Sequence, residues 1–145
     1  MRIAVLNGPN LNLLGTREPE VYGTTTLAEL EQQVRAEAAR LKVTLTWMQT
    51  NHEGAFVDTV QALRGQVDGA IVNAAAFTHT SLAIRDAFLA VKVPFVEVHL
   101  SNIFAREAER RHSRLADLAL GVVTGFGPAG YSMALQALVT RLSGG

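Results

Sequence analysis

The sequence predicts an α/β fold, a three-layer α/β/α sandwich around a five-stranded parallel sheet. Five short apolar runs alternate along the chain with segments whose apolar residues recur at helical spacing. Polar loops separate these segments, and no linker, internal repeat or low-complexity tract interrupts the series. A length of 145 residues suits one well-buried core. We therefore expect a single domain spanning residues 1–145.

The first half of the chain contains two strand–loop–helix units. Residues 3–6 are apolar and bounded by polar residues, as in a parallel strand that is buried on both faces. Thr26 and Glu29 form a capping box, which predicts a helix that begins there and runs to about Leu41. Residues 43–48 alternate and are rich in β-branched side chains, which predicts the second strand. Helical spacing then resumes after a polar break.

The second half continues the alternation. Its expected elements are a strand at 69–72, a helix at 81–90, a strand at 94–99, a short charged helix capped by Ser101 and Asn102, a strand at 118–124 and a helix at about 128–142. Right-handed crossovers should join the parallel strands. We expect a flavodoxin-like strand order rather than a Rossmann order, with the ligand outside the carboxyl ends of the strands.

The composition indicates a small-molecule ligand. Thirteen basic and thirteen acidic residues leave no net charge, so nothing favours nucleic acid or an anionic membrane as a partner. The chain has no cysteine, which excludes disulfides, thiolate nucleophiles and sulfur-ligated metals. Its first apolar run is too short for a signal peptide or a membrane span. We therefore expect a cytoplasmic protein.

The stretch after the first strand, residues 6–23, is the strongest site candidate. Connections in α/β units usually take about 2–6 residues, and longer ones are often lids or binding loops. Asn10 offers an amide, Arg17 a fixed cation and Tyr22 a phenol, and glycines near both ends can serve as hinges. We interpret the stretch as a closing lid. The alternative is a solvated loop in which Tyr22 only packs.

A second candidate lies on the fourth strand. Glu97 and His99 occupy alternate positions, so their side chains share a face and the carboxylate can orient the imidazole. Leu100 and Ser101 follow at an expected helix start, where unpaired backbone amides and the helix dipole bind anions. The alternatives are a structural acid–histidine pair and an ordinary helix cap.

The segment from Asn73 to Ser81 forms a third candidate. It ends the third strand with an amide, the His79 imidazole and several hydroxyls, and Asp86 lies about one turn into the following helix. Such hydrogen-bonding groups suit a polyhydroxylated ligand. By itself the segment is equally compatible with a capped helix entry in which His79 packs at the surface.

Three other site types fit the sequence poorly. Residues 125–130 satisfy G-x-G-x-x-G, but the acidic residue that a dinucleotide site needs about 20 positions later does not follow, so we expect helix–sheet packing there. A phosphorylated receiver would need acidic residues where Asn7 and Asn73 stand. The four histidines lie on separate loops without metal-ligand spacing. We therefore expect no metal site and no dinucleotide site.

The order of these motifs resembles the type II 3-dehydroquinate dehydratases. The string Asn-Gly-Pro-Asn-Leu-Asn-Leu-Leu-Gly at 7–15, followed by Arg-Glu-Pro and Tyr-Gly, looks like the opening motif of that family. The likeness continues through Asn-His-Glu-Gly at 51–54, Thr-His-Thr-Ser at 78–81 and Val-Glu-Val-His-Leu-Ser-Asn at 96–102. It implies a cofactor-free hydro-lyase of the shikimate pathway that converts 3-dehydroquinate to 3-dehydroshikimate by anti elimination through an enolate.

The resemblance also implies a role for each motif residue. Tyr22 would remove the proton from C2, Arg17 would stabilise the transition state, Asn10 would help to hold the enolate, and His99, oriented by Glu97, would protonate the departing C1 hydroxyl. The substrate would be gripped by Asn73, His79, Asp86, Arg110 and the backbone of Leu100 and Ser101. The family further implies a dodecamer built from trimers, in which Asp86 reaches a neighbour's active site.

A phenol base needs electrostatic help. An ordinary tyrosine has a pKa of about 10, so only about one part in a thousand is ionised at pH 7. Lowering that pKa toward 7 takes about 4 kcal/mol of preferential phenolate stabilisation, which one or two guanidiniums can supply in a water-poor site. Arg17 and Arg106 are the candidates for this role.

The sequence departs from the family pattern at two places. The family often has Pro-Gly-Ala-Tyr where this chain has Ala-Ala-Ala-Phe at residues 74–77, and Glu109 stands where a Phe usually precedes Arg110. These changes bear on loop geometry and affinity. The competing function is a flavodoxin-like module that binds a flavin or a nucleotide phosphate through the same loops. The absorbance of the purified protein would distinguish such a binding module from the enzyme.

Overall fold

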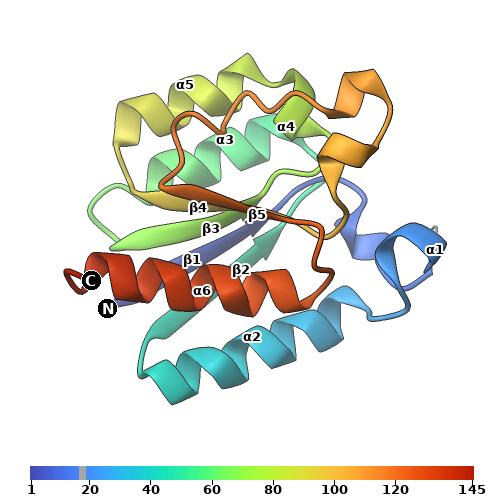
Figure 1. The fold of residues 1–145 in the computed structure, drawn as a ribbon. Helices are drawn as coiled ribbons and strands as arrows, with labels where there is room; N and C mark the ends of the chain where they lie inside the picture. The colour runs from blue at the N-terminus through green and yellow to red at the C-terminus, as the bar shows by residue number, and fades with distance from the viewer. Residues whose placement is uncertain (17–18) are drawn as a thin grey trace.

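A computed structural model describes residues 1–16 and 19–145 and shows a three-layer sandwich (Figure 1). The middle layer is a parallel sheet of five strands in the order β2-β1-β3-β4-β5. The strands are β1 (Arg2–Asn7), β2 (Thr44–Gln49), β3 (Gly69–Asn73), β4 (Phe95–His99) and β5 (Gly121–Thr124). The predicted fold class and flavodoxin-like strand order are confirmed.

Long helices cover both faces of the sheet. α2 (Leu27–Leu41) and α6 (Ala129–Leu142) lie on one face, and α3 (Glu53–Ala62) and α5 (Leu82–Val91) lie on the other (Figure 1). The loops contain η1 (Leu11–Leu13), α1 (Pro19–Tyr22), α4 (Phe77–Thr80), η2 (Ile103–Ala105) and η3 (Ala108–Arg110). Within the described ranges, no helix combines the length and the apolarity that crossing a membrane requires.

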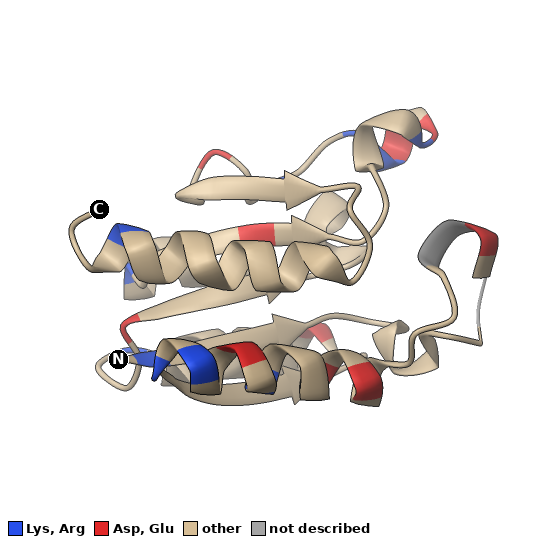
Figure 2. Ribbon diagram, turned by 60° about the horizontal axis from the view of Figure 1, so that its bottom comes forward, with Lys and Arg blue, Asp and Glu red and all other residues tan. Residues whose placement is uncertain are grey.

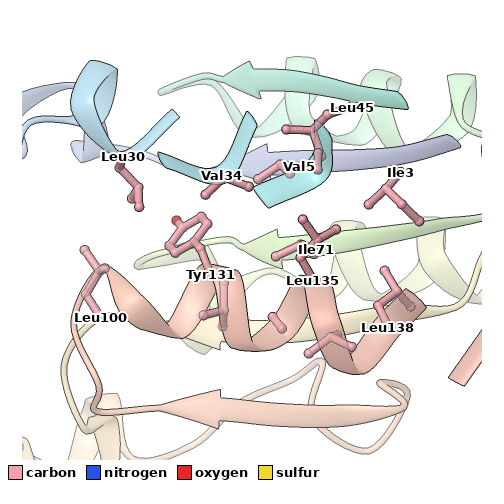
Figure 3. Close-up of a cluster of buried hydrophobic side chains, with 14 of the residues drawn as sticks. Ile3, Val5, Leu30, Val34, Leu45, Ile71, Leu100, Tyr131, Leu135 and Leu138 are labelled. Carbon is pink, nitrogen blue, oxygen red and sulfur yellow. The ribbon is translucent and has the colours of Figure 1, made fainter. Parts of the chain in front are cut away.

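The alternation of side chains along the central strands produces two apolar cores. Ile3 and Val5 of β1 point to the face covered by α2 and α6, whereas Ala4 and Leu6 point to the face covered by α3 and α5. Figure 3 shows the first of these cores, into which Tyr131 of α6 projects. Because the central strands are buried on both faces, their apolar runs are continuous rather than alternating.

Helix capping follows the sequence signals. The Thr26 side chain accepts a hydrogen bond from the Glu29 backbone N–H at 3.2 Å, as the capping box predicts. Ser81 caps α5 in the same way, accepting from the Ile84 N–H at 2.9 Å. The predicted starts of these two helices are therefore confirmed.

Two predicted elements are wrong in extent. The charged helix expected after Ser101 is replaced by the short 3₁₀ turns η2 and η3, since the segment buries only Ile103 and has no apolar stripe that would stabilise a longer helix. The strand expected at 118–124 begins at Gly121, because the N–H groups of Leu118 and Ala119 bond to the Leu115 carbonyl and form a turn.

Charged side chains lie mostly on the helices and loops (Figure 2). Among the described strands, β4 is the only one that carries an acidic residue, Glu97, and its side chain is fully buried. A carboxylate in this position is costly unless hydrogen-bond donors surround it.

The backbone between β3 and α4 passes very close to the loop that follows β1. Gly8 donates its N–H to the Asn73 carbonyl at 2.8 Å, and a Cβ on Gly8 would lie 2.2 Å from the Ala74 carbonyl oxygen. Only glycine fits there.

Ala75 adopts a left-handed conformation with φ of 52°, at the position where the related motif often has glycine. An L-residue pays about 1–2 kcal/mol for that conformation.

Ala75→Gly should therefore stabilise the protein by about 0.5–1 kcal/mol, because glycine adopts the left-handed conformation without strain. The greater conformational entropy of glycine in the unfolded chain offsets part of this stabilisation. The midpoint of urea unfolding measures the change. Ala76, with φ of −63°, is the matched control. Ala76→Gly should destabilise by about 0.5–1 kcal/mol, and a loss of stability in both variants would contradict the strain at Ala75.

Candidate active site

A pocket opens at the carboxyl ends of β1, β3 and β4, where the predicted sheet topology places ligands. The predicted site residues that line it are Asn10, Asn73, His79, His99, Leu100, Ser101, Arg106 and Arg110. Glu97 lies beneath this surface, in contact with His99. Eight of the predicted residues thus come together from loops that are distant in sequence.

Three predicted residues stand apart from this group. Asp86 is exposed on α5 and does not line the pocket of its own chain. Arg17 lies outside the described residues. Tyr22 is the last residue of α1, and its side chain falls outside what the structure describes. The lid interpretation of the whole stretch stays a prediction.

Glu97 and His99 form a buried pair at the end of β4. The His99 Nε2 lies 2.5 Å from Glu97 Oε2, and the two side chains are respectively 5% and 0% exposed. A carboxylate only accepts hydrogen bonds, so Nε2 carries the hydrogen and Nδ1 is the nitrogen left for the pocket. The alternation of the strand predicts this pairing correctly. A histidine held in this way can deliver a proton from Nδ1 to a ligand.

His79 faces His99 across the pocket. The two rings are stacked, with centroids 6.5 Å apart and an interplanar angle of 20°. The His79 Nδ1 lies 2.8 Å from the His112 carbonyl oxygen, which can only accept, so Nδ1 carries the hydrogen and Nε2 is the remaining acceptor. Burial lowers the pKa of His79, and this effect exceeds the opposing influence of the His112 carbonyl. His79 is therefore a neutral hydrogen-bonding residue.

A buried polar chain supports the floor of the pocket. Asn73 Nδ2 donates to the Tyr131 hydroxyl at 2.9 Å, and that hydroxyl donates to Asn7 Oδ1 at 2.6 Å. Asn73 Oδ1 accepts from the Ala75 N–H at 3.1 Å, and Asn7 Nδ2 donates to the Met48 carbonyl at 3.0 Å. Most of the bonding capacity of Asn73 is thus used within the protein, which leaves one N–H of its amide for a ligand.

Sequence reasoning missed Asn7 and Tyr131 as parts of the site. Asn7 is the register partner of Asn73, so two amides stand side by side at the ends of β1 and β3. That pairing follows once the strand order is known. Tyr131 gives no comparable signal, because its neighbours in α6 are mostly apolar or small and its position reads as core.

The loop after β4 supplies positive charge to the mouth of the pocket. Arg106 and Arg110 line it from the segment of η2 and η3. Arg106 Nη1 donates to the Ser101 hydroxyl at 3.3 Å, and Arg110 is paired with Glu107. The helix dipole expected after Ser101 is absent because only a 3₁₀ turn begins there. The positive charge at this mouth of the pocket therefore comes from guanidinium groups rather than from a helix dipole.

The start of the predicted lid is fixed by the neighbouring loop. Asn10 has φ of 68°, and its backbone N–H donates to Asn51 Oδ1 at 2.9 Å. Gln49 Nε2 donates to the same Oδ1 and to the Gly8 carbonyl, each at 3.1 Å. The amide of Asn10 is thus presented to the pocket from a backbone that β2 holds in place.

The glycine pattern at residues 125–130 lies at the start of α6. A Cβ on Gly130 would be 3.4 Å from a methyl of Val98 and 3.5 Å from one of Val123, which is ordinary van der Waals contact, so the packing of α6 on β4 and β5 does not by itself require glycine there. Gly125 and Gly127 have φ of 99° and 63°, so a left-handed backbone conformation, and not the expected helix–sheet packing, explains these two glycines. Among the described side chains, no three of the His, Cys, Asp and Glu type cluster as metal ligands would.

Comparison with known proteins decides the family. The model of the family described as dehydroquinase class II matches residues 1–139. The chain belongs to this family. A 3-dehydroquinate dehydratase from Citrobacter koseri is 57% identical over 143 residues, which cover 99% of this chain and 95% of the relative. One from Yersinia pestis strain Pestoides F is 56% identical over 141 residues, covering 97% of this chain and 94% of the relative.

Solved structures of family members have the same fold. The type II dehydroquinase from Propionibacterium acnes superposes with a TM-score of 0.92 at 38% identity, covering 96% of each chain. The enzyme from Butyrivibrio crossotus superposes with a TM-score of 0.93 at 38% identity, covering 95% of this chain and 97% of the other. The family assignment thus agrees in sequence and in three dimensions.

Proposed function

We propose that this chain catalyses the dehydration of 3-dehydroquinate to 3-dehydroshikimate, a hydro-lyase step of the shikimate pathway. The observation that carries the proposal is the buried Glu97–His99 pair, which presents Nδ1 to a pocket that also contains Asn10, Asn73 and two guanidiniums. Membership of the dehydroquinase class II family and the names of the relatives identify the reaction. Appearance of an enone absorbance from 3-dehydroquinate tests it directly.

The proposed reaction proceeds in two proton transfers. Tyr22, as its phenolate, removes the proton from C2, and the electron pair moves into the neighbouring carbonyl to give an enolate. The enolate collapses as the bond from C1 to its hydroxyl oxygen breaks. His99, as its imidazolium with a hydrogen on both ring nitrogens, gives its Nδ1 proton to that oxygen, which leaves as water, and the ring double bond forms. Asn10 and Arg17 stabilise the enolate and its transition state.

Tyrosine content supports the choice of base. The chain has two tyrosines. Tyr131 is fully buried, its hydroxyl is bound to Asn7 and Asn73, and burial raises its pKa well above the usual range. A phenol in that environment cannot serve as a base near neutral pH. Tyr22, in the segment between the pocket and α2, is therefore the phenol that we assign to proton abstraction, with Arg17 and Arg106 favouring its ionised form.

Substrate binding follows from the same set of groups. The neutral His79 and the remaining N–H of Asn73 suit the hydroxyls of the substrate, and Arg110 together with the backbone of Leu100 and Ser101 suits its carboxylate and ring oxygens. The alternative of a flavin- or nucleotide-phosphate-binding module is not favoured, because the family match covers residues 1–139.

Tyr22→Phe should lower kcat by at least about a thousandfold and leave substrate affinity largely unchanged, because it removes the base and keeps the ring. Single-turnover rates and equilibrium binding of the substrate measure the two effects. Tyr131→Phe is the control variant. It should lower the free energy of unfolding by about 1–3 kcal/mol, because Asn7 and Asn73 lose their shared hydroxyl partner. Its loss of kcat should be far smaller than that of Tyr22→Phe. A near-normal kcat in Tyr22→Phe would exclude Tyr22 as the base.

His99→Ala should separate the two half-reactions, since the C2 proton is already acidic beside the ketone. In deuterium oxide we expect slow exchange at C2 of recovered 3-dehydroquinate with little product, measured by NMR. Tyr22→Phe should show neither exchange nor product. Dehydration by His99→Ala at nearly the parental rate would mean that another group protonates the leaving hydroxyl.

We also propose that the protein acts as a dodecamer built from trimers, in which Asp86 completes a neighbour's site. Its exposure on α5, away from the pocket of its own chain, supports this arrangement. Light scattering should give a mass of about twelve chains, and Asp86→Asn should raise KM more than it lowers kcat. A fully active monomer would refute both statements.

A further inference from the structure

Ser113 makes three hydrogen bonds on the far side of Glu97 from His99. The Ser113 hydroxyl donates to Glu97 Oε1 at 2.8 Å. The Ser113 Oγ also accepts hydrogen bonds from the backbone N–H groups of Leu115 and Ala116, each at 3.1 Å. Ser113 does not line the pocket at the carboxyl ends of the strands. It touches the catalytic pair only through the Glu97 carboxylate.

The two backbone donors fix the direction of the Ser113 O–H. A hydroxyl has one hydrogen and two acceptor lone pairs. The N–H groups of Leu115 and Ala116 occupy the lone pairs, so the single hydrogen is directed to Glu97 Oε1. Ser113 is therefore a donor of fixed orientation and not a freely rotating hydroxyl.

The carboxylate that receives this bond has no exposure to water. Glu97 is 0% exposed, and among the described residues each of its oxygens has one donor: His99 Nε2 at Oε2 and Ser113 Oγ at Oε1. A donor at each oxygen fixes the plane of the carboxylate, and that plane sets where the His99 ring can point. Removing Ser113 leaves a buried charged acceptor unpaired, which costs more than the loss of an exposed bond.

We propose that Ser113 is a positioning residue for the dehydration, acting on His99 through Glu97. It holds the carboxylate so that Nε2–H is bound and Nδ1 faces the leaving hydroxyl. This inference rests on the proposed role of His99 as the acid. Ser113 exchanges no proton with the substrate and should affect the loss of water, while proton abstraction at C2 continues.

A purely structural role for Ser113 is the competing explanation. A serine often accepts backbone N–H groups two and three residues ahead and so stabilises a turn. That role uses only the lone pairs of the hydroxyl. The bond to Glu97 uses its hydrogen, so the two roles can be separated by comparing turnover with stability.

The test compares Ser113→Ala and Ser113→Thr with the parent. Ser113→Ala should lower kcat for dehydration about tenfold or more, leave KM within about twofold, and raise the ratio of C2 deuterium exchange to product formed. Ser113→Thr keeps the hydroxyl and should restore most of kcat. The control is Asp68→Ala, which removes a bond to the Arg2 N–H at the amino ends of β1 and β3, away from the pocket, and should lower stability without changing that ratio.

The outcomes distinguish this inference from the proposed function. If His99→Ala exchanges C2 without forming product, while Ser113→Ala has the parental kcat and exchange ratio, the positioning role is wrong and the acid assignment stands. The positioning role is also wrong if Ser113→Ala loses exchange and dehydration equally, because that is the result of a distorted pocket. If His99→Ala dehydrates at nearly the parental rate, both assignments fail. If Ser113→Thr does not fold, the positioning role is still tested by comparing the ratio of C2 deuterium exchange to product formed in Ser113→Ala with the same ratio in Asp68→Ala.

Discussion

A fully buried carboxylate in the middle of a parallel sheet is the constraint on which the site depends. Glu97 lies in β4, between β3 and β5, where water cannot solvate its charge. It is tolerated because His99 and Ser113 each supply a donor. The same contacts that make the charge tolerable also orient the imidazole. The burial of the Glu97 carboxylate and the orientation of the His99 ring are thus two consequences of one arrangement.

A second buried network plays the same part on the other side of the pocket. Tyr131 extends from α6 into the apolar core (Figure 3). Its hydroxyl joins Asn7 at the end of β1 to Asn73 at the end of β3. Its hydroxyl both donates and accepts, so neither amide is left unpaired in the core. Asn73 in turn fixes the Ala75 N–H, in the backbone that lines the pocket. The packing of α6 against the sheet therefore holds the floor of the pocket, although Tyr131 itself does not line the pocket.

The positive charge of the site comes from a segment with little regular structure. Arg106 and Arg110 lie in the short 3₁₀ turns between β4 and β5, and each has an acidic or hydroxyl partner. Burial is the largest cause that lowers the pKa of His79, and the charge of Arg110 acts in the same direction. A neutral His79 places no additional positive charge beside the stacked His99 ring.

The sequence by itself determined the fold and most of the site. Alternating apolar runs and helical spacing predicted the five strands and the long helices, and the parallel sheet then placed Asn10, Asn73, His79 and His99 at one edge. The period of two along β4 predicted that Glu97 and His99 share a face. These features depend on local spacing and on a topological rule, so they can be read without coordinates.

Only the tertiary structure decided which groups support that site. Ser113 is sixteen residues from Glu97, and Tyr131 is far from both Asn7 and Asn73 in sequence, so no local pattern marks them. The expected helix after Ser101 failed for a related reason, because its length depends on how much apolar surface the segment buries against the rest of the chain. Hydrogen-bond partners and burial are properties of packing between distant segments, and the sequence does not specify them until the fold brings those segments together.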